Sequence, residues 1–202
     1  MANKITTNSR NVYLVGNPNS GKTSLFNAIT GERHRVGNWP GVTVQKIEGI
    51  TDTANGRLII NDLPGTYSLT PATPEEEIVL KTLDEAATGI IINVVDIANF
   101  ERNLFLTTQL VELGVNPVVS LNCFDSFTRA GGSIDLQKFS AFTGTTPFPT
   151  VARRGEGVSS MIEHLSRPES LATECCNNML ALPDLWKKAA EDVLACQGLK
   201  WA

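Results

Sequence analysis

The sequence predicts an α/β fold: a mostly parallel sheet of six to seven strands, with helices on both faces and one antiparallel edge strand. Short apolar runs alternate with segments of helical apolar spacing along almost the whole chain, which favours a parallel sheet between two helical layers. The turn ANGR joins candidate strands at 43–51 and 57–61, and this hairpin supplies the antiparallel strand. The chain has 202 residues and 42% hydrophobic content, which suits one globular domain with a short appendage.

The strand and helix candidates follow one another in a regular order. Residues 11–15 are an apolar run expected to form the first strand, and a Gly-rich loop separates them from a helix that reaches about Thr30. Residues 31–43 contain glycine and proline without an apolar period, which predicts a long loop. The later candidates are a helix at 75–87, a strand at 90–95, a helix at 100–113, a strand at 117–121, a helix at 134–143, a strand at 147–151 and a helix at 157–166.

The regular alternation stops at the segment RPES. We expect residues 1–167 to form the main domain and residues 168–202 a short C-terminal extension, with one helix near 184–196. Too little chain remains after the break for a second independent core.

Charge and cysteine usage argue against several function classes. The net charge is −4 and no basic block occurs, so a nucleic-acid partner has no electrostatic support. The four cysteines form no C-x-x-C pair, which argues against a zinc site or a disulfide framework. No run of about 20 apolar residues exists, so no membrane-spanning segment is expected in this chain.

The strongest chemical signal is the segment GNPNSGKTS (residues 16–24), here called the phosphate loop. It fits the pattern G-x-x-x-x-G-K-[ST] between a strand and a helix, which predicts a P-loop NTPase. Backbone N–H groups of such a loop bind phosphate oxygens, Lys22 charges the β- and γ-phosphates, and Thr23 offers its hydroxyl to Mg²⁺. The predicted phosphate-binding residues are Gly16, Asn17, Pro18, Asn19, Ser20, Gly21, Lys22, Thr23 and Ser24.

Two further segments are expected to act on the γ-phosphate. Asp62 begins DLPG at the end of an apolar strand, where its carboxylate can hold Mg²⁺ through water. Gly65 has no Cβ, so its N–H can approach the γ-phosphate. In the loop segment WPGVTV, Thr43 can close onto Mg²⁺ and the γ-phosphate, and Gly41 and Val42 precede it.

The segments NCFD and VAR predict a guanine site. The carboxylate of Asp125 can accept hydrogen bonds from guanine N1–H and its 2-amino group together, and adenine offers no such donor pair. We expect Asn122 to brace the neighbouring loops, and the Ala152 N–H to reach guanine O6. The predicted base-binding residues are Asn122, Cys123, Asp125, Val151, Ala152 and Arg153.

These elements, in this order, resemble the sequence boxes of Era-like bacterial GTPases. The segments NWPGVTV and DLPGTYSL narrow the resemblance to the N-terminal G domain of the ferrous-iron transport protein B (FeoB) family, over about residues 10–167. The resemblance implies a Ras-like G domain with switch I at 31–43 and switch II from Asp62 to about Glu77. It also implies a K⁺ ion at Asn19. The expected metal ligands are Thr23, Thr43 and Asp62 for Mg²⁺ and Asn19 for K⁺, and the expected catalytic residues are Lys22, Thr43, Gly65 and Asn19.

The expected function is GTP binding and slow, Mg²⁺-dependent GTP hydrolysis. Turnover is expected to be slow because Thr66 stands where Ras-type enzymes have a water-orienting glutamine. The family resemblance implies a regulatory or driving domain at the cytoplasmic face of the bacterial inner membrane, in cis to an iron-permease domain outside this chain. Self-association through apolar residues of the 168–202 segment is a further expectation. The alternative is an Era-like switch in ribosome or tRNA maturation, which would require a basic appendage.

Overall fold

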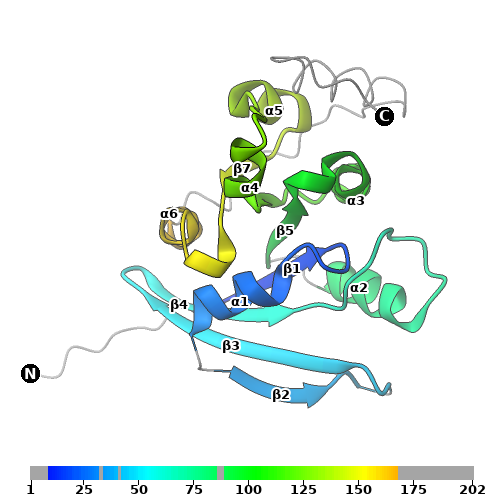
Figure 1. Ribbon diagram of the computed structural model, residues 1–202. Coiled ribbons are helices and arrows are strands. Elements are labelled where there is room, and N and C mark those ends of the chain that lie inside the picture. The colour runs from blue at the N-terminus through cyan, green and yellow to red at the C-terminus, as the bar shows by residue number, and fades with distance from the viewer. Residues whose placement is uncertain (1–8, 32–33, 41, 86–88, 168–202) are drawn as a thin grey trace, which may run out of the picture.

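A seven-stranded sheet runs through the described part of the chain, in the order β2-β3-β4-β1-β5-β6-β7 (Figure 1). This computed structural model describes residues 9–31, 34–40, 42–85 and 89–167, so the predicted extension at 168–202 lies outside it. The parallel strands that the alternation predicts are β1 (Ser9–Gly16), β4 (Gly56–Asp62), β5 (Ile90–Asp96), β6 (Val118–Asn122) and β7 (Thr146–Pro149).

The antiparallel side of the sheet differs in part from the prediction. Strand β3 (Gln45–Thr53) runs antiparallel to β4, as the hairpin predicts. The outermost strand, however, is β2 (His34–Asn38), which pairs antiparallel with β3, so the prediction of a loop throughout 31–43 was wrong there. Every residue of β2 is exposed, so the strand has no apolar alternation that could reveal it. Its backbone pairing with β3 defines it instead.

Helices cover both faces of the sheet, as predicted. Leu14 of β1 packs in a core cluster with residues of α1 and α6, whereas its neighbour Val15 packs with α2 and α3, as the alternation of a strand requires. The bounds of these helices are α1 Lys22–Thr30, α2 Pro74–Glu85, α3 Phe100–Glu112 and α6 Val158–Ser166. A third cluster joins α3 to α5 (Leu136–Thr143).

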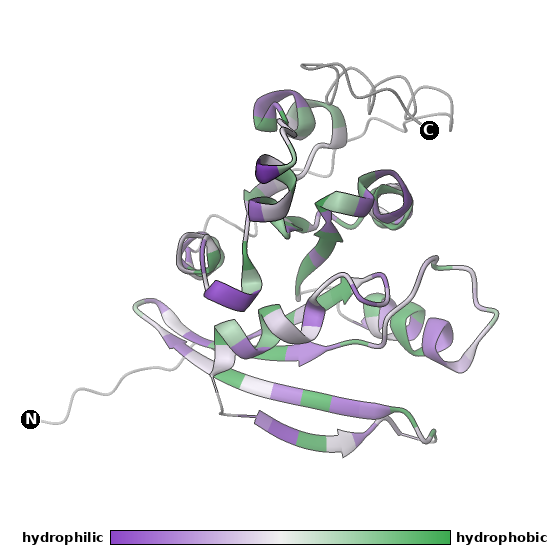
Figure 2. Cartoon of the chain, viewed as in Figure 1, coloured by the Kyte–Doolittle hydropathy of each residue, from purple (hydrophilic) through white to green (hydrophobic). Residues whose placement is uncertain are grey.

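The central strands carry most of the buried apolar surface. All residues of β5 except Asp96 are buried, and Figure 2 shows this strand mostly in the apolar colour. Strand β3, near the edge, alternates between apolar and polar colours in the same view. A strand buried on both faces reads as a continuous apolar run, which is why β5 was predictable.

One short helix was not predicted. Helix α4 (Phe124–Arg129) begins directly after Cys123, which has a left-handed backbone with φ 61°. A helix of six residues is too short to show an apolar period in the sequence. Among the helices of the described residues, none combines the length and apolar character needed to cross a membrane.

Candidate functional site

The predicted site residues lie at the carboxyl ends of parallel strands. Gly16 is the last residue of β1, Asp62 the last of β4 and Asn122 the last of β6, and Val151 is the second residue after β7. Ligands of open parallel sheets bind at this edge. The sheet topology therefore brings the phosphate loop, switch II and the predicted base site to one side of the fold (Figure 1).

Lys22 is held beneath the phosphate loop. Its side chain is buried, and its Nζ donates hydrogen bonds to the carbonyl oxygens of Gly16 at 3.0 Å and Asn17 at 3.3 Å. Burial lowers the pKa of Lys22, and the nearby charge of Asp62 opposes this shift. The ammonium group is thus fixed in a site where burial disfavours its charge.

Asp62 and Thr23 form an oxygen-rich pair next to Lys22. Burial raises the pKa of Asp62 to about 6, against the opposing effects of the Lys22 charge and a hydrogen bond from the Thr23 hydroxyl. The Oδ1 atom of Asp62 is buried without a hydrogen-bond partner among the described residues. Carboxylate and hydroxyl oxygens are ligands that Mg²⁺ prefers, so this pair fits a magnesium ion.

Two more unpartnered polar atoms lie in the phosphate loop. Asn17 Oδ1 and Ser20 Oγ have no hydrogen-bond partner within the described part of the chain. Both residues are buried, with only 1% of their surface exposed. Buried polar atoms are normally paired, because an unpaired one costs the free energy of its desolvation. Their grouping around this loop indicates a site for a polar ligand.

Switch II begins directly on the phosphate loop. A Cβ atom added to Gly65 would lie 3.1 Å from Lys22 Nζ and 3.1 Å from Pro18 Cα, so a side chain at this position would press on both. The backbone N–H of Thr66 donates to the carbonyl oxygen of Gly16 at 3.2 Å. The absence of a side chain at residue 65 therefore allows the close approach.

The predicted switch I ligand Thr43 makes no hydrogen bond to the other two predicted Mg²⁺ ligands among the described residues. It is exposed in the connection between β2 and β3, and the contacts of the described residues include none between Thr43 and either Thr23 or Asp62. Val42 donates its N–H to the carbonyl oxygen of Trp39 at 3.3 Å, while Gly41 lies outside the described residues. Trp39 packs against the core cluster beneath α2 and α3, and so anchors this connection.

Asn122 links the phosphate loop to the segment that follows β7. Its Nδ2 donates to the carbonyl oxygen of Ser20 at 2.9 Å, and its Oδ1 accepts from the N–H of Ala152 at 3.0 Å. A Cβ added to Gly21 would lie 2.1 Å from Asn122 Nδ2, so the contact needs a glycine there. The Ala152 N–H, expected to meet guanine O6, is thus bonded within the protein.

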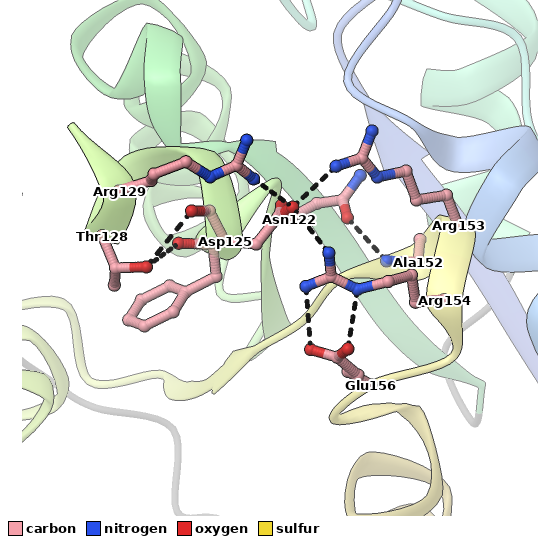
Figure 3. Close-up of polar contacts among 9 residues, drawn as sticks. Asn122, Asp125, Thr128, Arg129, Ala152, Arg153, Arg154 and Glu156 are labelled. Atoms are coloured by element: carbon pink, nitrogen blue, oxygen red, sulfur yellow. Dashed lines mark hydrogen bonds and ion pairs between the residues drawn. The ribbon is translucent and has the colours of Figure 1, made fainter.

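Three arginines converge on Asp125, as Figure 3 shows. Its Oδ2 atom accepts from Arg153 at 2.6 Å, Arg129 at 2.9 Å and Arg154 at 3.1 Å. Arg153, and after it Arg154, hold the pKa of Asp125 below its usual range. Arg154 also pairs with Glu156.

The roles of Arg129, Arg154 and Glu156 in this cluster were not predicted from the sequence. The four-residue spacing between Asp125 and Arg129 would have indicated an ion pair had helix α4 been predicted. Arg153 alone was among the predicted residues, and it makes the shortest of the three contacts.

The remaining predicted residues lie around these groups. Asn19 is exposed at the tip of the phosphate loop with a left-handed backbone, φ 65°, and Ser24 is exposed on α1. Cys123 is half-buried, and burial raises the pKa of its thiol. Val151 is buried, and its N–H donates to the carbonyl oxygen of Glu156 at 3.0 Å.

The chain is similar to known ferrous iron transport proteins. The protein-family model described as "Ferrous iron transport protein B" matches residues 10–165. The Fe(2+) transporter FeoB of Escherichia coli (strain K12) is 45% identical over 154 residues, which are 74% of this chain and 20% of that protein. The chain spans about a fifth of the length of the curated relatives it matches.

Solved structures show the same likeness. The cytosolic domain of L. pneumophila FeoB has a TM-score of 0.73 at 42% identity, over 77% of this chain and 62% of that one. The cytosolic domain of the T. maritima FeoB iron transporter in a GDP form has a TM-score of 0.75 at 34% identity, over 79% of this chain and 62% of that one.

Proposed function

Because the chain belongs to the ferrous iron transport protein B family and contains its N-terminal G domain, we propose that it binds GTP and GDP and hydrolyses GTP slowly with Mg²⁺. One observation supports this most directly: the buried Lys22 lies among three unpartnered buried oxygens, on Asn17, Ser20 and Asp62. A phosphate chain would accept hydrogen bonds from Lys22 and the Ser20 hydroxyl, and a Mg²⁺ ion would be held by Asp62. Asn122, Asp125 and the segment 151–153 would bind guanine beside them, with the Ala152 N–H exchanging its bond to Asn122 Oδ1 for one to guanine O6.

The proposed reaction is in-line attack of water on the γ-phosphate. The protein contributes positioning and charge stabilisation, since phosphoryl transfer needs little covalent chemistry from it. Lys22 would stabilise charge on the β- and γ-phosphates, and Gly65 would direct its N–H to the γ-phosphate. Thr23 and Asp62 would hold Mg²⁺, with Thr43 joining them after switch I closes. When bound, Mg²⁺ supplies positive charge at the phosphate oxygens.

Slow turnover follows from the environment of Thr66. This residue is buried, and its hydroxyl donates to the carbonyl oxygen of Ser68. It is therefore committed to the shape of switch II and is a poor candidate for orienting the attacking water. No glutamine stands at this position to take that role.

A potassium ion at Asn19 would compensate for the missing charge. Asn19 is exposed at the loop tip, where its amide oxygen can reach a large monovalent cation. A cation near the β- and γ-phosphates stabilises negative charge in the transition state.

The decisive experiment compares GTP hydrolysis in matched KCl and NaCl, for the wild type and Asn19→Ala. Single-turnover rates and affinities for GTP, GDP and ATP are measured together. We expect guanine selectivity, faster hydrolysis in KCl, and loss of the K⁺ effect in Asn19→Ala with GTP affinity retained. Equal rates in both salts, or a K⁺ effect that survives in the variant, contradict the potassium assignment. Failure to bind guanine nucleotides contradicts the whole proposal.

The role in the longer protein rests on the relatives. Since they are Fe²⁺ transporters, we propose that residues 1–167 act as a regulatory or driving domain at the cytoplasmic face of the bacterial inner membrane, in cis to an iron-permease domain. In one reading GTP hydrolysis drives transport, and in the other the domain is a GTP-operated switch that hydrolysis only resets. Comparing the single-turnover hydrolysis rate with the rate of nucleotide release distinguishes the two.

Two other expectations remain proposals. Self-association would involve apolar residues of 168–202, outside the described part, and sedimentation at rising concentration tests it. The alternative of an Era-like switch in ribosome or tRNA maturation would need RNA binding. The net charge of −4 argues against it.

A further inference from the structure

The start of switch II is fixed at two points four residues apart. At one end Gly65 and Thr66 lie on the phosphate loop, and the Thr66 N–H donates to Gly16 at 3.2 Å. At the other end the Leu69 N–H donates to the side-chain Oε1 of Gln109 at 2.9 Å. Between them the Thr66 hydroxyl bonds to Ser68. The position of Gly65 over Lys22 therefore depends on both attachments.

Gln109 belongs to α3 and lies at the border of a hydrophobic cluster. The side chain of Leu69 is buried in this cluster with Leu106 and Leu110 of α3. Gln109 is half-buried, so its hydrogen bond to Leu69 is partly shielded from water. The apolar contact holds Leu69 against the helix without a preferred direction, whereas the hydrogen bond fixes the orientation of its backbone.

A second contact between α3 and switch II lies in the first turn of the helix and is weaker. The Arg102 guanidinium lies over the ring of Tyr67, 5.1 Å from its centroid, and both residues are exposed. An exposed contact of this kind contributes little. The Arg102 carbonyl oxygen also accepts from Asn17 Nδ2 at 3.4 Å, so α3 touches the phosphate loop as well. Gln109 is thus the polar group of α3 that holds switch II.

We propose that Gln109 is a positioning residue for GTP hydrolysis, which keeps Leu69 on α3 and thereby keeps Gly65 directed at the γ-phosphate. This inference rests on the proposed GTPase function. Gln109 itself touches neither the phosphate loop nor the base-site residues in the hydrogen bonds of the described residues. Its loss should therefore affect hydrolysis and leave nucleotide affinity unchanged.

The test compares Gln109→Leu with Gln109→Glu in the full chain. Leucine removes the acceptor while keeping similar bulk, and glutamate keeps an oxygen acceptor for the Leu69 N–H. In Gln109→Leu we expect about tenfold faster hydrogen exchange at the Leu69 amide and about tenfold slower single-turnover hydrolysis, the factor that follows from losing one hydrogen bond. GDP affinity should stay within about twofold, because the binding groups are unchanged. Gln109→Glu should restore both exchange protection and hydrolysis.

Glu112→Leu is the matched control, because Glu112 is an exposed residue at the end of the same helix. It should behave as the wild type. Unchanged Leu69 exchange or unchanged hydrolysis in Gln109→Leu overturns the proposal, as does an equal loss in the Glu112 control or a failure of Gln109→Glu to rescue. If the wild type does not hydrolyse GTP, the proposed function fails instead, and the Leu69 exchange separately reports whether Gln109 holds switch II.

Discussion

Lys22 occupies an environment that disfavours a positive charge unless an anion is close. Its Nζ contacts two carbonyl oxygens, and burial lowers its pKa. A polyphosphate would compensate this desolvation directly. At the residue scale, the site is therefore built around one buried cation and the oxygens that surround it.

Replacing Lys22 with alanine should abolish measurable GTP hydrolysis and weaken GTP binding. The loss in rate is expected to be about 10²-fold or more, the range for removing one preorganised charge from a transition state. Single-turnover hydrolysis and nucleotide titration measure the two effects. Lys81→Ala, at an exposed lysine of α2, is the control and should change neither. A Lys22→Ala variant with normal affinity and turnover would remove the phosphate-loop assignment.

Replacing Asp125 with asparagine should lower GTP affinity at least about tenfold and allow a xanthine nucleotide to compete. Unpaired buried groups cost about 1–3 kcal/mol each, more when charged, and one of the two guanine donors would lose its acceptor and face the amide NH₂ group instead. Competition titrations with GTP and xanthosine triphosphate measure this. Glu156→Gln is the control, because Glu156 pairs only with Arg154 among the residues drawn (Figure 3). This variant disturbs the arginine cluster and leaves the Asp125 carboxylate in place. If it loses as much affinity as Asp125→Asn, Asp125 has no special role.

At the scale of single elements, helix α2 illustrates how local sequence sets a boundary. Thr73 Oγ1 accepts from the N–H of Glu76 at 3.3 Å, and the Glu76 carboxylate accepts from the N–H of Thr73 at 3.0 Å. This reciprocal pair is a capping box, and Pro74 occupies the first helical position, where its missing N–H is harmless. The end of switch II is therefore fixed by residues within it.

Replacing Thr73 with alanine should lower the free energy of unfolding by about 1 kcal/mol, the usual cost of losing a side-chain cap. Urea denaturation followed by circular dichroism measures the change. Thr70→Ala is the control, since Thr70 is an exposed threonine three residues earlier. Equal stability of the two variants would show that the cap contributes nothing.

At the scale of the whole molecule, ligand and fold should stabilise each other. An excess of GDP with Mg²⁺ at about 100 times its dissociation constant adds about 2.7 kcal/mol to the stability of the folded state. For a chain of this size that corresponds to a rise in melting temperature of about 5–10 °C. Thermal unfolding with GDP and with ADP at the same concentration measures this, and ADP should have little effect. An equal shift with both nucleotides would contradict the guanine selectivity assigned to Asp125.

The sequence predicted the parts of the fold that rest on local signals. The phosphate loop and the buried strand β5 were predictable because a motif or an apolar run marks each one. Strand β2 was not, because all its residues are exposed and only pairing with β3 defines it. The contact of Arg154 was missed because this residue approaches Asp125 from 29 residues further along the chain, and no local pattern reports that.

The link made by Asn122 has a consequence for the order in which the chain is synthesised. Asn122 bonds to Ser20, 102 residues earlier, and to Ala152, 30 residues later. The phosphate loop leaves the ribosome about a hundred residues before its brace Asn122, and the partner of that brace emerges later still. Contacts of such long sequence separation form late in folding. A nascent chain that ends before Ala152 therefore carries an intact phosphate motif without the hydrogen bond between Asn122 and Ala152 that completes the brace.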